Sequence, residues 1–204
     1  GARGITAFLV DGDRAGFHRG KTEPKLGIRA SATCEIEFQD YVARAEDVLG
    51  QEGQGFRIAM SVLDAGRIGI ASQAIGLARA AYEATLAYVK ERKAFGQPIM
   101  DFQNTKFVLA DCKAEVLAGK TLIDHCIELL LEDNLDAATA SIAKMWGSDK
   151  QIEIVSRCLQ IFGGYGYMME YPIAQMYAAA RVQSIYGGTN EIMKMIIARE
   201  VFGG

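Results

Sequence analysis

The chain has 204 residues, of which 50% are hydrophobic and 23% are charged, and its formal net charge is −3 at pH 7. This composition is typical of a globular protein with enough apolar residues for a core, and it argues against a disordered chain. The near balance of acidic and basic residues argues against a polybasic surface, so we expect no nucleic-acid partner.

Other features of the sequence argue against a membrane-spanning segment, a signal peptide, a disulfide scaffold and a metal site. No uncharged apolar run reaches the roughly 18 residues that a membrane-spanning helix needs, so we expect no membrane insertion. The opening residues lack the basic and apolar regions of a signal peptide. The four cysteines lack CxxC spacing, which indicates free thiols in a reducing compartment; they are Cys34, Cys112, Cys126 and Cys158. The two histidines, His18 and His125, lack a carboxylate-x-x-His spacing, which argues against a metal site.

The first 50 residues are predicted to form strands. Short apolar or alternating runs occupy residues 5–10, 25–29 and 32–38, a pattern typical of strands. Three strands so close to the first residue indicate the later part of a sheet. We therefore expect residues 1–50 to be the C-terminal part of a β domain, a partial sheet or barrel, and we expect the chain to begin inside that domain.

From residue 51 to 204 the pattern becomes helical. Apolar residues recur at three- and four-residue steps from 56 to 90, as on one face of a helix. Further helices are predicted over residues 98–131, 137–162, 170–181 and 190–202. Long helices joined by short loops predict an antiparallel bundle. The predicted fold class is therefore mainly α, with a helical-bundle domain over residues 51–204.

Particular residues mark the expected ends of these helices. Pro98 is predicted to open the second helix, because proline is favoured at a first helical position. Asp136 is predicted to be the N-cap of the third helix, and Thr189 or Asn190 that of the last. The glycines that begin at Gly163 are predicted to end the third helix.

Two segments could hold an anionic ligand. Residues 92–98 place Arg92, Phe95 and Gly96 at the turn between two helices, shortly before Gln103. An arginine beside a helix N-terminus can bind a phosphate, although a solvated charged turn explains the same residues. Residues 187–191 place two glycines before a capped helix. Free backbone amides there could donate hydrogen bonds to a ligand oxygen, or the glycines could have only a structural role in the loop.

Two other segments have a structural explanation as well. Three glycines over residues 163–167 would let a backbone approach a ligand closely, but they follow a helix, so they do not fit the strand-loop-helix of a nicotinamide-binding unit. A helix C-cap and turn explains them equally. Asp64 and Arg67 are an acid and a base within a helix, which more often face solvent or each other than a ligand.

In this order the segments resemble the acyl-CoA dehydrogenase family over the whole chain. The middle β domain of that family is similar to the Lys-x-Gly-x-Arg-x-Ser-x-Thr run that starts at Lys25. The helical domain is similar at residues 63–67 (Leu-Asp-Ala-Gly-Arg), at Arg92-x-x-Phe95-Gly96, Gln103, Gln160–Gly166 and Tyr186–Glu191. The last of these motifs resembles the long-chain type, whereas Leu-Asp-x-Gly-Arg-Ile-Gly-Ile-Ala resembles the short-chain type.

The resemblance implies an FAD-dependent oxidation of a fatty or branched acyl-CoA to the trans-2-enoyl-CoA. In the family, a carboxylate removes the α-proton while the β-hydrogen leaves as hydride to flavin N5, and an electron-transfer flavoprotein accepts the electrons. The resemblance also implies a homo-oligomer, a dimer or dimer of dimers, since FAD is shared between subunits. The implied location is the bacterial cytoplasm or the mitochondrial matrix.

The resemblance assigns expected roles to named residues of this sequence. Asp64, Arg67 and Gly188 are implied to face the acyl-CoA, and the backbone N–H of Gly187 to bind its thioester oxygen. The implied FAD-binding residues are Arg92, Phe95, Gln103, Gln160, Gly163, Gly164, Thr189 and Glu191.

The catalytic base of the family has no counterpart here. Family members carry a glutamate either at the position of Gly187 or at that of Gly66, and this sequence has glycine at both. Loss of a general base costs on the order of 10²–10⁴ in rate. The alternative is therefore a catalytically inactive subunit that binds FAD or acyl-CoA, or pairs with an active homologue; a flavin oxidase or monooxygenase with another base is a third reading.

Overall fold

The computed structural model describes residues 1–203, predominantly as helices with a few short strands, which confirms the predicted fold class. The chain divides into two compact units between Leu63 and Asp64. This division falls inside the first long helix, α1 (Gly55–Glu91), so a domain boundary at residue 50 stays a prediction. No helix among residues 1–203 is long and apolar enough to cross a bilayer.

The first unit contains two antiparallel strand pairs. β1 (Ala7–Phe8) pairs with β4 (Val48–Leu49), and β2 (Phe17–Thr22) pairs with β3 (Cys34–Phe38). At one end of the longer ribbon the rings of Phe17 and Phe38 meet edge to face, with centroids 5.7 Å apart. Such cross-strand aromatic pairs fix the register of a ribbon.

The expected strand over residues 25–29 is wrong. Ile28 has a φ of 48°, which turns the backbone, and Lys25 Nζ reaches Thr33 Oγ1 at 3.0 Å to close the loop. β2 was not predicted, because its residues are mostly polar and exposed and therefore lack the alternation of a half-buried strand.

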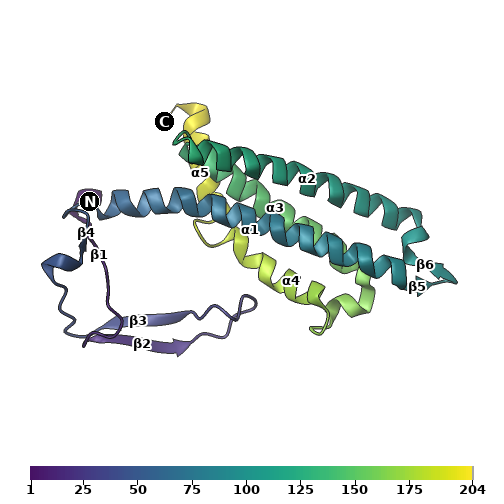
Figure 1. Ribbon diagram of the computed structural model, residues 1–204, viewed down its shortest axis with the longest axis horizontal. Coiled ribbons are helices and arrows are strands. Elements are labelled where there is room, and N and C mark those ends of the chain that lie inside the picture. The colour runs from purple at the N-terminus through teal and green to yellow at the C-terminus, as the bar shows by residue number, and fades with distance from the viewer. Residues whose placement is uncertain (204) are drawn as a thin grey trace. The chain divides into compact units, whose positions relative to one another are not determined.

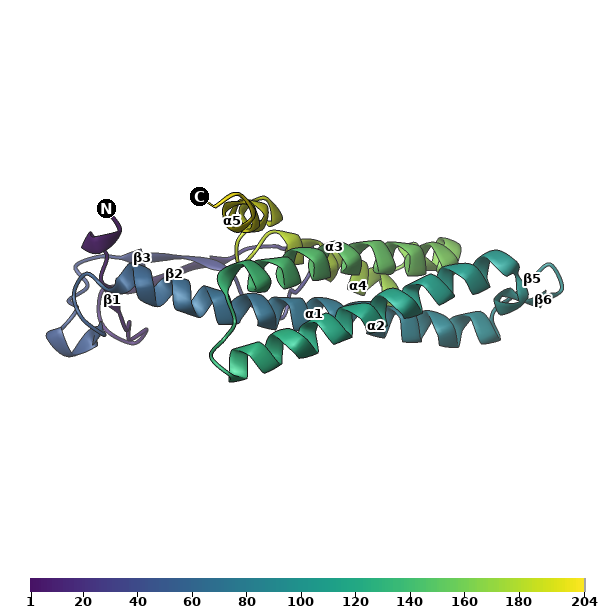
Figure 2. The ribbon, with the colours of Figure 1, turned by 90° about the horizontal axis from the view of Figure 1, so that it is seen from above.

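The second unit is a helical bundle. α1, α2 (Gln103–Leu131) and α3 (Ala137–Phe162) run alongside one another, and α4 (Pro172–Ala180) and α5 (Asn190–Phe202) pack against α3 (Figures 1 and 2). Buried small residues such as Ala78, Ala81 and Cys112 bring α1, α2 and α3 close together around Ile154 and Phe162. Short 3₁₀ turns occupy Ile99–Asp101, Gly163–Tyr167 and Arg181–Ser184.

The predicted caps of α3 and α5 are confirmed. Asp136 accepts hydrogen bonds from the backbone N–H groups of Ala138 and Thr139 at 2.9 and 2.8 Å. Its hydrogen bonds with Thr139, through the hydroxyl and the backbone N–H, lower the pKa of the Asp136 carboxyl. The Thr189 hydroxyl accepts from the N–H of Ile192 at 3.4 Å. These local signals fix where the two helices begin.

The prediction that Pro98 opens α2 is wrong. Pro98 lies in a small hairpin formed by β5 (Lys93–Ala94) and β6 (Gln97–Pro98). The helix begins at Gln103, after a 3₁₀ turn. Phe95 and Gly96, with φ of 52° and 82°, supply the two positive values that a tight two-residue hairpin turn requires.

Two helical glycines are expected to respond oppositely to alanine. A Cβ at Gly119 would lie 2.6 Å from Ile75 Cδ1 and 3.2 Å from Trp146 Cζ3, so Gly119→Ala should lower the free energy of unfolding by about 1–3 kcal/mol. Gly76, with no neighbour within 4 Å, should gain about 0.5–1 kcal/mol from the better helix propensity of alanine. Urea denaturation measures both changes. If both variants were more stable, or both less stable, than the wild type, the close packing at Gly119 and the open space at Gly76 would be contradicted.

Candidate functional site

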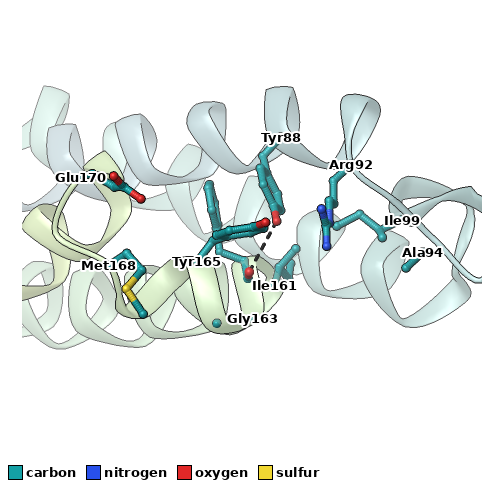
Figure 3. Close-up of a pocket in the computed structure, with 11 residues that line it drawn as sticks. Tyr88, Arg92, Ala94, Ile99, Ile161, Gly163, Tyr165, Met168 and Glu170 are labelled. Carbon is teal, nitrogen blue, oxygen red and sulfur yellow. Dashed lines mark hydrogen bonds between the residues drawn. The ribbon is translucent and has the colours of Figure 1, made fainter.

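A groove lies between the C-terminal end of α1 and the turn that follows α3 (Figure 3). Its volume is about 660 Å³, and it is lined by Tyr88, Arg92, Ala94, Ile99, Ile161, Phe162, Gly163, Gly164, Tyr165, Met168 and Glu170. Helix α1 and the β5–β6 hairpin form one side of the groove, and the end of α3 with its 3₁₀ turn forms the other.

Aromatic rings make up part of the groove wall. The ring of Tyr88 stacks on that of Phe162, with centroids 4.0 Å apart and an angle of 14° between the planes. The Tyr88 hydroxyl donates to the carbonyl oxygen of Phe162 at 3.4 Å, the dashed line in Figure 3. Burial raises the pKa of Tyr88, so the phenol stays neutral at physiological pH. The stacked pair ties the end of α3 to α1.

The floor of the groove is bare backbone. Gly163 follows α3 with φ and ψ of 59° and −136°, a conformation that favours glycine. A Cβ atom built on Gly163 or Gly164 meets nothing within 4 Å. The absence of side chains here leaves a cradle in which a ligand can approach the peptide groups closely.

Arg92 supplies the positive charge of the groove. Its guanidinium lies over the ring of Tyr165, 5.1 Å from the centroid, and points from the end of α1 into the groove (Figure 3). Within residues 1–203 it forms no ion pair. A cation–π contact orients a guanidinium without neutralising it, so Arg92 remains available to an anion.

The structure brings only part of the predicted cofactor set into this groove. Arg92, Gly163 and Gly164 line it, whereas Phe95, Gln103 and Gln160 do not. Phe95 sits at the hairpin tip and is 96% exposed, and Gln103 and Gln160 are exposed on α2 and α3. Two tyrosines of the groove, Tyr88 and Tyr165, were not predicted. Tyr88 lies one helical turn before Arg92, and this four-residue spacing could have indicated it.

A second candidate site is the glycine turn, residues 187–189, just before α5. Gly187 and Gly188 have φ of 64° and 93°, values that only glycine adopts easily. Among residues 1–203 no acceptor is found for the backbone N–H groups of Gly187, Gly188 and Thr189. Unpaired amides next to a helix N-terminus favour an oxygen with negative charge.

A fully buried lysine supports the glycine turn from inside the bundle. Lys144 on α3 is 0% exposed. Its Nζ donates to the carbonyl oxygen of Gly188 at 2.7 Å and to Asn190 Oδ1 at 2.8 Å. Burial lowers the pKa of Lys144 to about 8, and the positive charge of Arg67 acts in the same direction.

The depressed pKa of Lys144 gives a prediction about stability. The pKa of Lys144 is about 8 in the folded chain and 10.5 ordinarily. Between pH 8 and 10.5 the unfolded chain therefore binds one more proton than the folded chain, and the free energy of unfolding increases with pH. Below pH 8 the cost of the buried charge is present in full. The unfolding free energy of the wild type minus that of Lys144→Met should therefore rise by up to about 3 kcal/mol from pH 7.5 to pH 10.5. Denaturant titrations along the pH series measure this difference, and a flat difference would contradict the burial of the charge.

The predicted substrate residues Asp64 and Arg67 contact each other. Arg67 is buried, and its Nη1 lies 2.5 Å from Asp64 Oδ1. Arg67 Nε is also buried and has no partner among residues 1–203. The pair therefore matches the reading in which the two side chains face each other, and a contact with substrate stays a prediction.

The two expected base positions differ in the space that they leave for a side chain. Gly66 and Ile70 are four residues apart on α1, so they share a helix face. A Cβ built on Gly187 would lie 2.3 Å from Ile70 Cδ1, whereas one built on Gly66 meets nothing within 4 Å. A side chain at Gly66 therefore fits the present packing, while one at Gly187 must displace Ile70 and adopt a strained φ.

The fold and these two sites define a class of protein: a helical bundle with an aromatic groove, whose charged residues are Arg92 and Glu170, and a separate turn of free amides. Residues 53–202 match the family model for the C-terminal domain of acyl-CoA dehydrogenases. The chain belongs to the acyl-CoA dehydrogenase family of flavoprotein oxidoreductases.

Curated relatives include both types that the motifs resemble. The chain is 43% identical over 200 residues to the long-chain specific acyl-CoA dehydrogenase of Rattus norvegicus, covering 98% of this chain and 46% of the relative. It is 44% identical over 196 residues to the short-chain specific acyl-CoA dehydrogenase of Megasphaera elsdenii, covering 96% and 51%. The chain thus spans about half the length of these relatives.

Solved structures agree with this assignment. Butyryl-CoA dehydrogenase from Megasphaera elsdenii matches with a TM-score of 0.96 and 42% identity, over 99% of this chain and 53% of that chain. A chain in a structure described as the electron transferring flavoprotein of Acidaminococcus fermentans matches with a TM-score of 0.97 and 40% identity, over 100% and 54%. An acyl-CoA dehydrogenase complexed with FAD from Bacillus anthracis matches with 0.91 and 30%, over 97% and 38%.

Proposed function

We propose that the protein carries out the FAD-dependent α,β-dehydrogenation of an acyl-CoA thioester to the trans-2-enoyl-CoA. The single observation that carries the proposal is the turn of unpaired amides at residues 187–189, on a chain of this family. The groove at Arg92 supports it independently. The alternative, favoured by glycine at both base positions, is a catalytically inactive subunit that binds FAD or acyl-CoA, or pairs with an active homologue.

The residues of the groove fit FAD. The unpaired guanidinium of Arg92 would hold the pyrophosphate, and the bare backbone of Gly163 and Gly164 would let the dinucleotide approach. Phe95, Gln103 and Gln160 lie outside the groove lining and are exposed, so they would contact the same cofactor from its outer side. The groove would receive the FAD of a neighbouring subunit in a homo-oligomer, a dimer or dimer of dimers.

The glycine turn would bind the thioester. An α-proton of a thioester leaves only if donors stabilise the enolate oxygen, and backbone N–H groups aimed at that oxygen do so at little reorganisation cost. Here the N–H of Gly187 would donate to the carbonyl oxygen, with Gly188, Asp64 and Arg67 beside the acyl-CoA. When bound, FAD supplies the hydride acceptor; Thr189 and Glu191 would lie near it.

The partner and location follow from the same reaction. The electrons would leave to an electron-transfer flavoprotein, and the match to a chain in a structure described by that name supports this partner. The proposed location is the bacterial cytoplasm or the mitochondrial matrix, which agrees with relatives from both sources.

Anaerobic flavin bleaching tests the proposal. The full-length protein would be loaded with FAD and mixed with acyl-CoAs from short to long and branched. Rapid bleaching supports dehydrogenation and the best chain length names the substrate. Bound flavin that is never bleached, together with co-purification of a glutamate-bearing homologue, supports the inactive subunit. Oxygen consumption without electron-transfer flavoprotein would instead indicate an oxidase. A protein that binds neither FAD nor acyl-CoA contradicts the first two readings.

A further inference from the structure

A buried charge on α3 makes its only hydrogen bonds to the segment that carries the glycine turn. Within residues 1–203, Lys144 Nζ has only these two acceptors, the carbonyl oxygen of Gly188 and Oδ1 of Asn190, at 2.7 and 2.8 Å. Neither acceptor carries a full charge. A buried ammonium without a directly bonded carboxylate is costly, so a hydrophobic residue at this position would give a more stable core.

The second acceptor is itself held in place. Asn190 Nδ2 donates to Asp149 Oδ1 at 2.8 Å and to Ser148 Oγ at 3.0 Å. The first residue of α5 is thereby fixed to α3 through three side chains. The charged groups around Lys144 are Asp149 on α3, Glu191 on α5 and Arg67 on α1, and carboxylates and guanidinium groups ordinarily titrate far from pH 8.

The bond to Gly188 determines the direction of an amide. The carbonyl oxygen of Gly188 and the N–H of Thr189 belong to one planar trans peptide, in which they point in opposite directions. With the oxygen bound to Lys144 inside the bundle, the N–H of Thr189 points away from Lys144. The positive charge on the oxygen also polarises this peptide and strengthens its N–H as a donor.

We propose that Lys144 is a positioning residue that, through the Gly188 carbonyl, holds the glycine turn in the conformation in which its free amides can receive the thioester oxygen. The proposal rests on the proposed function, because it takes acyl-CoA as the ligand of the turn. Lys144 does not touch the substrate. It acts through the Gly188 carbonyl, and its ammonium charge sets the direction and the donor strength of the Thr189 N–H.

The experiment follows the turn and its ligand separately. The full-length protein, with FAD added, would be labelled with ¹⁵N in glycine and threonine. In the wild type, the Gly188 and Thr189 amide resonances should shift with pH around a midpoint near 8, as Lys144 loses its proton. In Lys144→Met these resonances should be displaced and should not shift near pH 8. Affinity for a series of 2-enoyl-CoAs, measured by flavin absorbance, should be roughly tenfold weaker in this variant. In the wild type this affinity should fall above pH 8, whereas in Lys144→Met it should not change with pH there.

Ile154→Ala is the matched control, since Ile154 is also fully buried on α3 but holds no bond to the turn. It should lower stability and leave the pH profiles unchanged. Wild-type resonances that ignore pH, or enoyl-CoA affinity unchanged in a folded Lys144→Met, would overturn the proposal. The wild-type titration needs no substitution, so it decides even if the variant fails to fold. Amides that titrate in a protein that binds no acyl-CoA would overturn the proposed function and, with it, the assigned ligand.

Discussion

Gly66→Glu is expected to increase the rate of flavin bleaching by acyl-CoA by about 10²–10⁴-fold, the usual contribution of a general base. Gly66 is exposed on α1, and a Cβ there meets no atom within 4 Å. Glutamate is also a better helix former than glycine, so the substitution should not lower stability. Stopped-flow absorbance of the FAD-loaded full-length protein, under anaerobic conditions, measures the rate.

Gly66→Gln is the control for this substitution, because it has the same size without a carboxylate. It should leave the bleaching rate at the wild-type level. A wild type whose flavin already bleaches rapidly would show that a catalytic base exists elsewhere. A glutamine variant as fast as the glutamate variant would show that the missing carboxylate at position 66 does not limit the rate.

A glutamate at Gly187 should increase the rate of flavin bleaching less than a glutamate at Gly66. The contact of 2.3 Å to Ile70 Cδ1 and the φ of 64° both oppose a side chain there. Ile70→Val removes the Cδ1 atom alone, so the double variant Gly187→Glu/Ile70→Val should bleach faster than Gly187→Glu. Equal rates for the two would contradict the role of Ile70 in closing this position.

Arg92→Leu is expected to weaken FAD binding about 10–100-fold, which corresponds to the loss of hydrogen bonds to a charged group. The guanidinium has no other ion-pair partner within residues 1–203, so its removal costs no internal contact except the one with Tyr165. Arg92→Lys should recover only part of the affinity, because an ammonium cannot form the paired bonds of a guanidinium. Flavin retained after dialysis at several salt concentrations measures the effect.

Lys93→Leu is the neighbouring control. Lys93 is an exposed cation on β5 that does not line the groove. Its removal should change FAD affinity little. If both variants lose flavin equally, the groove works through general positive charge and Arg92 has no special part in it.

Local signals in the sequence were sufficient for the starts of α3 and α5. The ends of α3 and α5 follow from the cap residues Asp136 and Thr189, whose side chains bond to nearby backbone. The predicted start of α2 was wrong because Pro98 is compatible with a strand as well as with a helix. Only the pairing of β5 with β6 decides between the two. The strand β2 was missed because its pairing partner, rather than its own pattern, defines it.

The candidate sites were only partly predictable. Motif residues such as Arg92 and Gly163 were identified, and the structure places them in one groove. Lys144 was missed, because a lysine within a helix is ordinarily exposed and its burial depends on the packing of α5 against α3. Tyr165 was missed as a support for Arg92 because their contact joins two segments far apart in the chain.

The position of Ile70 has a consequence for how such proteins can diverge. Ile70 Cδ1 fills the space that a Cβ at Gly187 would need, whereas a Cβ at Gly66, one helical turn before Ile70, has no neighbour within 4 Å. The present packing therefore accepts an acidic side chain on the helix, and accepts one on the turn only after Ile70 becomes smaller. A lineage with this packing would therefore gain an acidic group on the helix by one point change, but would need a second change at Ile70 to carry one on the turn.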